Sequence, residues 1–290
     1  MTEIDHELVH RERAWQEWRV ERERRLAEPL GVLSQVALHW LGSEPERFPG
    51  LPGEWRAGAG GAEVTASGAD GLVLLSEDRP LSGTVAVEVA EAGAVRFLGF
   101  GAGIEIEVVR RTGRYGLRVY DPAAPALRAF AGIGSYAFDP SWVIDAEFRP
   151  YAEPRPIRVD GAQPGLVHDR LATGEVIFEH DGAEHRLLVF GDHGTTLSGS
   201  PRRSSEERSG GGLRRGVLTI LFHDRTNGAA TAAWRVLPVE PIGPGLVQLD
   251  FNRAANLPFA FTPYGTCPKP PAGNTLPFGV TAGEWNPVAR

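Results

Sequence analysis

Residues 103–121 read GIEIEVVRRTGRYGLRVYD. Apolar and polar side chains alternate on both sides of the Arg-Thr-Gly-Arg step at residues 111–114, and this step is a hairpin turn signal. Such alternation predicts two strands that each bury one face. Segments with the same period of two precede this stretch and are separated by Gly, Asp and Pro. The stretch therefore predicts one hairpin within a run of antiparallel strands.

The same pattern returns in the second half of the chain. Residues 141–151 (SWVIDAEFRPY), 174–180 (GEVIFEH) and 184–190 (EHRLLVF) read as strands with Gly-containing turn signals between them. A further strand runs into Asp224, and another returns through Trp234. The predicted fold class is mainly β: an antiparallel barrel or sandwich with an N-terminal helical arm.

The N-terminal residues have a helical pattern instead. Residues 3–28 predict a charged amphipathic helix that ends at Pro29. Four apolar side chains fall near one face: Leu8, Trp15, Trp18 and Leu26. This stripe predicts a helix that docks on the main domain. Because the same stripe could dock on another subunit, the arm is also a candidate surface for a homo-oligomer.

The chain is expected to divide into two parts. Residues 1–45 form the helical arm, with a second short helix that begins at Ser34, and residues 46–290 form a single antiparallel β domain. Residues 191–216 are rich in Ser, Arg and Gly, which predicts a flexible loop. A lid over a pocket is the alternative interpretation of that loop.

Two short motifs carry weak signals. His6-Glu7-Leu8-Val9-His10 has the H-E-x-x-H spacing of zinc proteases, but it lies at the start of a charged helix with no third ligand at a familiar spacing. Residues 99–103 read GFGAG and are followed by a strand, so the helix N-terminus that holds a phosphate is missing. We therefore predict no metal and no cofactor.

Net charge and composition limit the kinds of partner that the protein is expected to have. The formal net charge of −7 argues against nucleic acid or an anionic membrane as the main partner. No apolar run reaches the length of about 18 residues that a membrane-spanning helix needs. The N-terminal residues are too charged for a signal peptide, and the single Cys fits a reducing compartment. A cytoplasmic location is expected.

The segment from Asp250 to Glu284 concentrates polar side chains between six Pro and four Gly residues. Pro removes backbone donors and Gly permits unusual turns, so the segment predicts an irregular ordered loop of the kind that carries functional groups. The alternative is structural: its Asp and Asn side chains bind loop backbone, and its aromatic residues plug one end of the β scaffold. We call residues 250–284 the tail.

Several runs of residues suggest a relationship. The most distinctive is DFNRA at residues 250–254, followed by CPKPP at 267–271 and AGE at 282–284. Upstream runs are LHWL at 38–41 and RRTGRYGLRVYD at 110–121. Together they resemble an uncharacterised bacterial family, domain of unknown function 1684 (DUF1684), over most of the chain. The resemblance implies a mostly β, soluble protein of unknown activity, and it supplies no substrate.

One departure from the family bears on chemistry. Where the family often has a second Cys before Ala-Phe, this chain has Phe259. A site built from two cysteines is therefore not expected here. Cys267 has no His near it in the sequence, although His223 could approach it in space, and a buried structural thiol is the preferred interpretation.

The candidate site combines acids with amide and cationic groups. Asp250, Asp224 and Glu284 are the candidate catalytic residues, because two converging carboxylates can serve as one acid and one base. The candidate ligand-binding residues are Asn252, Arg253, Asn256, Asn274, Arg118 and Cys267. Asn side chains orient polar ligands, and Arg side chains clamp carboxylates or phosphates.

Three functional hypotheses follow. The first is an enzyme that performs acid–base chemistry on a polar metabolite. The second is a non-catalytic module that binds a small polar molecule, and the third is a structural or interaction protein. An acid–base pair within reach of one cavity would favour the first, whereas carboxylates that all point at backbone amides would remove its basis.

Overall fold

The structure is a computed structural model that describes residues 3–191 and 218–287. The predicted loop near 191–216 thus lies almost entirely outside the described residues. Contacts group the chain into two compact units. Described residues 3–24, 131–191 and 218–287 form unit 1, and residues 25–130 form unit 2. The expected arm over 1–45 and domain over 46–290 stay a prediction about folding units, which limited proteolysis would test.

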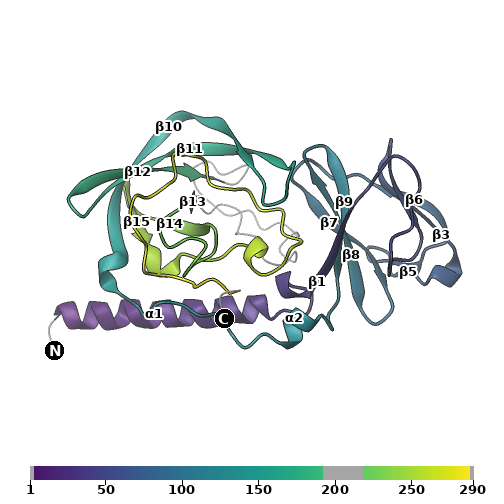
Figure 1. Cartoon of the computed structure of the whole chain (residues 1–290), viewed down its shortest axis with the longest axis horizontal. Coiled ribbons are helices and arrows are strands. Elements are labelled where there is room, and N and C mark those ends of the chain that lie inside the picture. Colours follow the sequence, from purple (N-terminus) through teal and green to yellow (C-terminus); the bar gives the residue numbers. More distant parts are fainter. Residues whose placement is uncertain (1–2, 192–217, 288–290) are drawn as a thin grey trace. The chain divides into compact units, whose positions relative to one another are not determined.

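Unit 1 contains a closed six-stranded antiparallel barrel (Figure 1). Each strand pairs with the next along the chain, and the last pairs with the first to close the barrel. Its strands are β10 (Val143–Asp160), β11 (Val167–His180), β12 (Ala183–Phe190), β13 (Leu218–Phe222), β14 (Arg235–Gly243) and β15 (Leu246–Asp250). The predicted antiparallel β fold with an N-terminal helix is confirmed.

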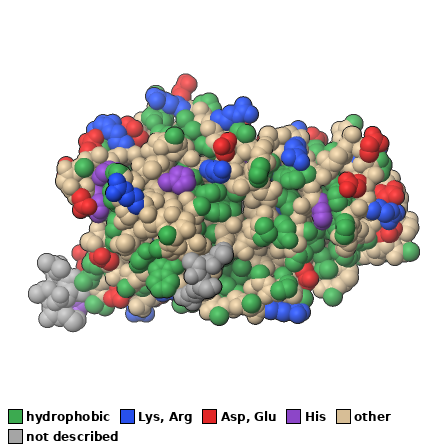
Figure 2. All heavy atoms as spheres, viewed as in Figure 1, with side chains coloured by type: hydrophobic (Ala, Val, Ile, Leu, Met, Phe, Trp, Pro, Cys, Tyr) green, Lys and Arg blue, Asp and Glu red, His purple; other side chains and the backbone are tan. Residues whose placement is uncertain are grey.

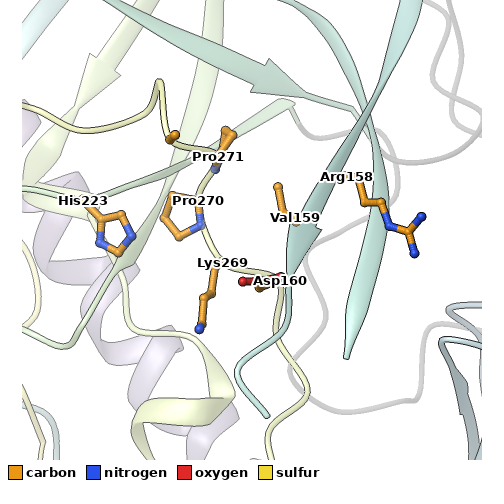
Figure 3. A pocket seen from close by; sticks show the side chains of 8 residues that line it. Arg158, Val159, Asp160, His223, Lys269, Pro270 and Pro271 are labelled. Carbon is orange, nitrogen blue, oxygen red and sulfur yellow. The ribbon is translucent and has the colours of Figure 1, made fainter. Parts of the chain in front are cut away.

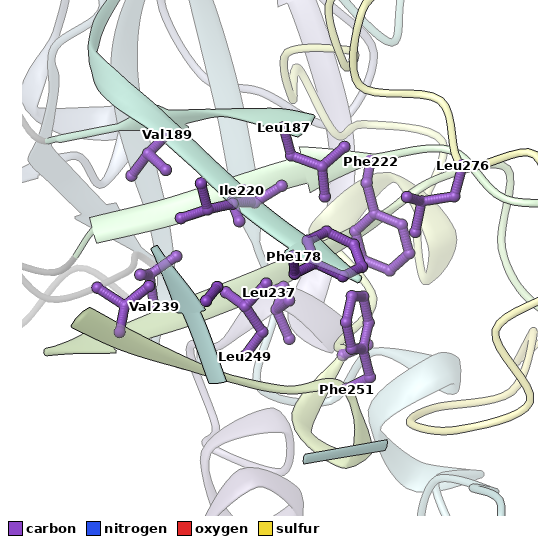
Figure 4. Close-up of a cluster of buried hydrophobic side chains, with 14 of the residues drawn as sticks. Phe178, Leu187, Val189, Ile220, Phe222, Leu237, Val239, Leu249, Phe251 and Leu276 are labelled. Atoms are coloured by element: carbon purple, nitrogen blue, oxygen red, sulfur yellow. The ribbon is translucent and has the colours of Figure 1, made fainter. Parts of the chain in front are cut away.

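The barrel interior is filled with side chains rather than hollow (Figure 4). Alternate residues of each strand point inward, as the period-two pattern requires. Phe222 and Phe178 both contact Phe251, at ring-centroid distances of 5.7 and 6.1 Å. Tail residues Leu276 and Val280 belong to the same buried cluster. The tail therefore completes the barrel core.

The described part of unit 1 also contains three short 3-10 helices and one long helix. The 3-10 helices η3 (Pro140–Trp142), η4 (Phe251–Arg253) and η5 (Pro258–Ala260) lie before β10 and in the tail. Helix α1 (Glu3–Leu26) binds unit 1 through Trp15, whose Nε1 donates to the carbonyl of Asn252 at 3.0 Å. Trp18 packs on a second buried cluster, whereas Leu8 is 38% exposed. The predicted apolar stripe is thus buried at Trp15, partly buried at Trp18 and open at Leu8.

Unit 2 has two sheets that pack on one buried cluster. The six-stranded sheet has the order β1-β9-β8-β7-β4-β5 and the other the order β2-β3-β6. Their strands are β1 (Gln35–Trp40), β2 (Glu54–Gly58), β3 (Gly61–Ala66), β4 (Val73–Leu74), β5 (Arg79–Pro80), β6 (Gly83–Val87), β7 (Ala94–Phe100), β8 (Ile104–Arg111) and β9 (Arg114–Tyr120). Short helices are η1 (Val32–Ser34), η2 (Gly68–Asp70) and α2 (Pro125–Arg128).

The hairpin predicted from residues 103–121 is present in unit 2. Arg111 pairs with Arg114, and the two residues between them have positive φ, 55° at Thr112 and 72° at Gly113. Two positive φ values are the mark of the turn that matches the right-handed twist of a hairpin. The predicted short helix after Ser34 is wrong: residues 35–40 form strand β1, which pairs with β9.

Candidate functional site

Asp224 lies two residues after the end of β13, and its side chain has no exposed surface. Its carboxylate accepts hydrogen bonds from the Arg235 guanidinium at 2.9 Å and from the backbone N–H groups of Thr226 and Val280 at 2.7 and 3.2 Å. Arg235 is equally buried and donates to the carbonyl of Val280 at 3.0 Å. This buried pair fastens the tail to the barrel, and its carboxylate is fully engaged.

Glu284 lies at the end of the tail, and its side chain is 2% exposed. Its carboxylate accepts from Arg22 Nε at 2.9 Å and from the backbone N–H of Asn256 at 2.6 Å. Arg22, which belongs to α1, also donates to the carbonyl of Asn256 at 2.6 Å. Glu284 thereby joins the long helix to two parts of the tail.

Asp250 ends β15 and caps η4. Its Oδ1 accepts from the backbone N–H and the side-chain amide of Asn252 at 3.1 and 2.9 Å, and Arg253 lies 3.2 Å from its Oδ2. Burial raises the pKa of this carboxyl group, and the bonds from Asn252 and the charge of Arg253 only partly oppose that shift. Asp250 is therefore the tail acid whose charge the fold disfavours.

A pH-dependent stability follows from the raised pKa of Asp250. The native state holds the proton more tightly than the unfolded chain, so this group stabilises the fold most below its unfolded pKa of about 3.9. That stabilisation is lost as pH rises through the folded pKa. The Asp250→Asn protein should therefore gain stability relative to wild type as pH rises from 4 toward 7. Urea unfolding of both proteins across this range measures the difference; a difference that stays flat or falls would contradict the raised pKa.

The three tail asparagines bind backbone rather than open space. Asn252 exchanges two hydrogen bonds with the backbone of Asp139, both of 3.0 Å. Asn274 does the same with Leu188 of β12, at 2.8 and 3.0 Å, and also donates to Leu221 of β13. Asn256 donates to the carbonyl of Trp285 at 2.7 Å. Asn274 thereby pairs the tail with two barrel strands, whereas Asn252 and Asn256 bond to the backbone of irregular segments.

Arg253 and Cys267, two other predicted ligand-binding residues, also have contacts within the fold. Arg253 pairs with Glu240 at 2.9 Å in addition to Asp250. Cys267, the single cysteine, is a buried thiol in an apolar cluster with Leu221 and Trp234. That position matches the structural interpretation of the thiol.

Arg118 belongs to unit 2, on β9. Its guanidinium donates to Glu107 at 2.6 Å, and the Tyr120 hydroxyl donates to the same carboxylate oxygen at 3.0 Å. Arg96 stacks over the Tyr120 ring at 3.4 Å. Burial raises the pKa of the Tyr120 hydroxyl, so it stays a donor. Arg118 is thus part of a buried ionic network across β7, β8 and β9.

The structure brings a different set of ionisable groups together in unit 1. A surface hollow of about 260 Å³ lies where the end of β10, the residue after β13 and the tail meet. Its walls are formed by Arg158, Val159, Asp160, His223, Lys269, Pro270, Pro271 and Ala272 (Figure 3). Asp160 and Lys269 lie beside one another in that view, with His223 next to Pro270, while Arg158 points away.

Backbone pairing holds this hollow in shape. The Lys269 N–H donates to the carbonyl of Asp160 at 2.8 Å, so the tail runs along the end of β10. The His223 N–H donates to Asn274, and the Leu276 N–H donates to His223, both at 2.8 Å. Because prolines flank Lys269 on both sides, its backbone has little freedom.

The ring of His223 has a defined proton position. Its Nδ1 lies 2.9 Å from the carbonyl oxygen of Ala233. A carbonyl oxygen only accepts, so Nδ1 carries a proton. In the neutral ring Nε2 is then an acceptor, available to a ligand in the hollow.

The sequence-based site missed Asp160 and Lys269 and considered His223 only as a neighbour of Cys267. One signal was available: Lys269 is the only lysine among 30 Lys and Arg residues. Lysine carries its charge on a compact ammonium, whereas guanidinium is a planar fork. His6 and His10 are exposed on α1, and no group of three metal-ligating side chains occurs in the described parts of the chain.

The surface charges in Figure 2 and the hydropathy of the helices do not indicate a further site. On the face in view, acidic and basic side chains are mixed among apolar ones (Figure 2). Within residues 3–191 and 218–287, no helix has the length and apolar character needed to span a membrane.

Comparisons with known proteins give a family but no activity. One solved structure that resembles the chain is a solution NMR structure of an uncharacterized protein from Haloarcula marismortui, at 24% sequence identity and a TM-score of 0.41 over 57% of this chain and 83% of that chain. The search of curated proteins finds no match. Residues 128–285 match the family described as "Protein of unknown function (DUF1684)". Because this match spans more than half of the 290 residues, the protein belongs to the DUF1684 family.

Proposed function

We propose that unit 1 binds a small polar molecule in the hollow formed by Asp160, His223 and Lys269. The observation that carries the proposal is the convergence of these three ionisable side chains, from three separate segments, on one concave surface. The carboxylates of Asp224, Asp250 and Glu284 contrast with them, since each is bound to backbone amides. Binding clefts characteristically present a few polar groups on a rigid scaffold.

The state of the hollow's side chains supports the proposal. No side-chain hydrogen bond or ion pair engages Asp160 or Lys269 within the described residues. Val159, Pro270 and Pro271 add apolar surface beside these charges. A volume near 260 Å³ suits a small metabolite rather than a large cofactor, since drug-sized ligands occupy pockets of about 300–1,000 Å³.

Acid–base catalysis is the second candidate, and His223 favours it. Its Nε2 is an acceptor, and Asp160 and Lys269 line the same hollow, so a bound molecule would have proton acceptors and a donor within one site. A catalytic role for Asp224, Asp250 and Glu284 stays a prediction. Their existing bonds support a structural role instead.

A thermal-shift screen against a library of polar metabolites tests the proposal. We expect ligands that raise the melting temperature of wild type by several degrees at saturation, since a ligand at 100 times its Kd adds about 2.7 kcal/mol. The same shift should disappear in His223→Ala and persist in Asp250→Asn. Shifts that survive His223→Ala but vanish in Asp250→Asn would move the site to the tail.

The expected setting and assembly of the protein are also proposals. The single Cys is a buried thiol, which supports a reducing, cytoplasmic location in a bacterium. Pairing of two copies through α1 is supported by Val9 and Val20, which are 59% and 69% exposed on that helix. Light scattering of wild type and Val20→Glu tests this, because a dimer through α1 would dissociate in the variant.

A further inference from the structure

We propose that the ligand of the hollow is a small zwitterion, a molecule with one carboxylate and one ammonium group such as an α-amino acid. This inference rests on the proposed function and narrows it to a chemical class. It follows from the charges that the hollow holds, from their lack of partners and from the orientation of one histidine ring.

Two opposite charges line the hollow without forming an ion pair. Lys269 provides an ammonium and Asp160 a carboxylate, yet no ion pair joins them within the described residues. Their segments are held together by the hydrogen bond from the Lys269 N–H to the Asp160 carbonyl, so both side chains start from neighbouring backbone positions. Figure 3 shows the two side chains beside one another at the edge of the hollow.

A ligand with both charges satisfies this arrangement better than one with a single charge. A ligand with only a carboxylate is attracted by Lys269 but repelled by Asp160. A ligand with only an amine is attracted by Asp160 but repelled by Lys269. A zwitterion places its carboxylate at Lys269 and its ammonium at Asp160.

His223 adds a second acceptor for the ligand's N–H groups. Because Nδ1 is committed to the carbonyl of Ala233, Nε2 is the nitrogen that can accept. Asp160 and His223 are therefore two acceptors on the wall of the same hollow, and an ammonium has three donors. Pro270 lies beside His223 in the same hollow, and its apolar surface suits a short aliphatic part.

Calorimetric titration with matched compounds tests the inference. The full-length protein is titrated with the twenty common amino acids, and each binder is compared with its deamino acid and its decarboxylated amine. We expect at least one amino acid to bind at least tenfold more tightly than both of its relatives. Asp160→Asn should weaken the binding of the amino acid and of the amine but not that of the deamino acid. Lys269→Met should weaken the binding of the amino acid and of the deamino acid but not that of the amine. Lys269→Arg, which keeps the charge, should retain most of the affinity.

The single lysine provides a second, site-specific readout. Protein labelled only with ¹⁵N-lysine has one backbone amide signal, that of Lys269, whose N–H contacts Asp160. Saturation with the best amino acid should move this signal, and its deamino acid at the same concentration should move it less. A deamino acid that binds as tightly as the amino acid would overturn the zwitterion, as would an unchanged Lys269 signal.

Failure of this inference and failure of the proposed function are distinguishable. If no amino acid binds but another library compound binds and is lost in His223→Ala, the zwitterion is wrong and the hollow remains the site. If no compound depends on His223, both are wrong.

Discussion

Replacing Asp224 by alanine should lower the free energy of unfolding by about 3–5 kcal/mol. The substitution leaves the Arg235 guanidinium, which has no exposed side-chain surface, without its carboxylate. It also removes the acceptor for the backbone N–H groups of Thr226 and Val280. Breaking one side of a buried ion pair is costly because the remaining charge cannot recover water. Urea denaturation followed by circular dichroism measures the loss.

The matched control is an exposed pair in the same unit. Glu240 lies 2.9 Å from Arg253, the same separation as in the buried pair, but its side chain is 53% exposed. Glu240→Ala should therefore cost less than about 1 kcal/mol. Equal losses in Asp224→Ala and Glu240→Ala would show that the Asp224–Arg235 pair does not anchor the tail.

Replacing Glu107 by alanine should destabilise the fold by a similar amount, about 3–5 kcal/mol. Its carboxylate accepts from Arg118 and from the Tyr120 hydroxyl, and Arg96 lies 3.5 Å away. Without it, Arg118 and Arg96 become neighbouring cations on one face of the sheet, and Arg118 is 9% exposed. The loss is measured as the shift of the urea midpoint relative to wild type.

An exposed pair in unit 2 controls for charge removal alone. Glu54 lies 3.1 Å from Arg47, with side chains 45% and 64% exposed. We expect Glu54→Ala to change stability by less than about 1 kcal/mol. If Glu107→Ala also lowers stability by less than about 1 kcal/mol, the Glu107 network does not hold Arg118 in place. Arg118 would then be available to bind a ligand, as the sequence predicts.

The strands could be predicted because one face of each is buried. Residues 104–111 and 114–120 form β8 and β9 where the alternation and the turn signal indicate them. Closure into a barrel could not be predicted, because it depends on pairing between β10 and β15, which lie far apart in the sequence. Barrel and sandwich share the same local pattern.

Strand β1 shows where local reading fails. Residues 35–40 contain apolar residues at neighbouring and alternate positions, so a short helix and a strand fit equally well. Ser34 looked like a helix cap, but its hydroxyl donates to the carbonyl of Gly31 and closes η1 instead. Pairing with β9 decides the conformation, and that pairing is a tertiary effect.

The tail was correctly identified as ordered and rich in inward polar groups. The sequence could not show what those groups bind, because Asp and Asn use the same atoms for backbone amides and for ligands. In the structure Asn252 and Asn274 bind the backbone of Asp139 and Leu188. A polar residue in an irregular loop is therefore as much a sign of loop architecture as of function.

The hollow could not be found from any one stretch. Asp160, His223 and Lys269 lie in three segments that only the barrel brings together. Lys269 lies within the CPKPP run, but Asp160 and His223 belong to none of the runs that resemble the family. The rarity of lysine in an arginine-rich chain was the available cue.

The central claim is that Asp224 and the polar side chains of the tail are hydrogen-bonded to backbone, so the ligand site is the hollow. Native-state hydrogen exchange tests this claim most directly. Four amides donate to these side chains: Val280 to Asp224, Asn256 to Glu284, Leu188 to Asn274 and Asp139 to Asn252. The account predicts that these amides are protected about as strongly as those of the barrel strands. Exchange at the rate of an unstructured chain would show that the side chains are free for a ligand and would contradict it.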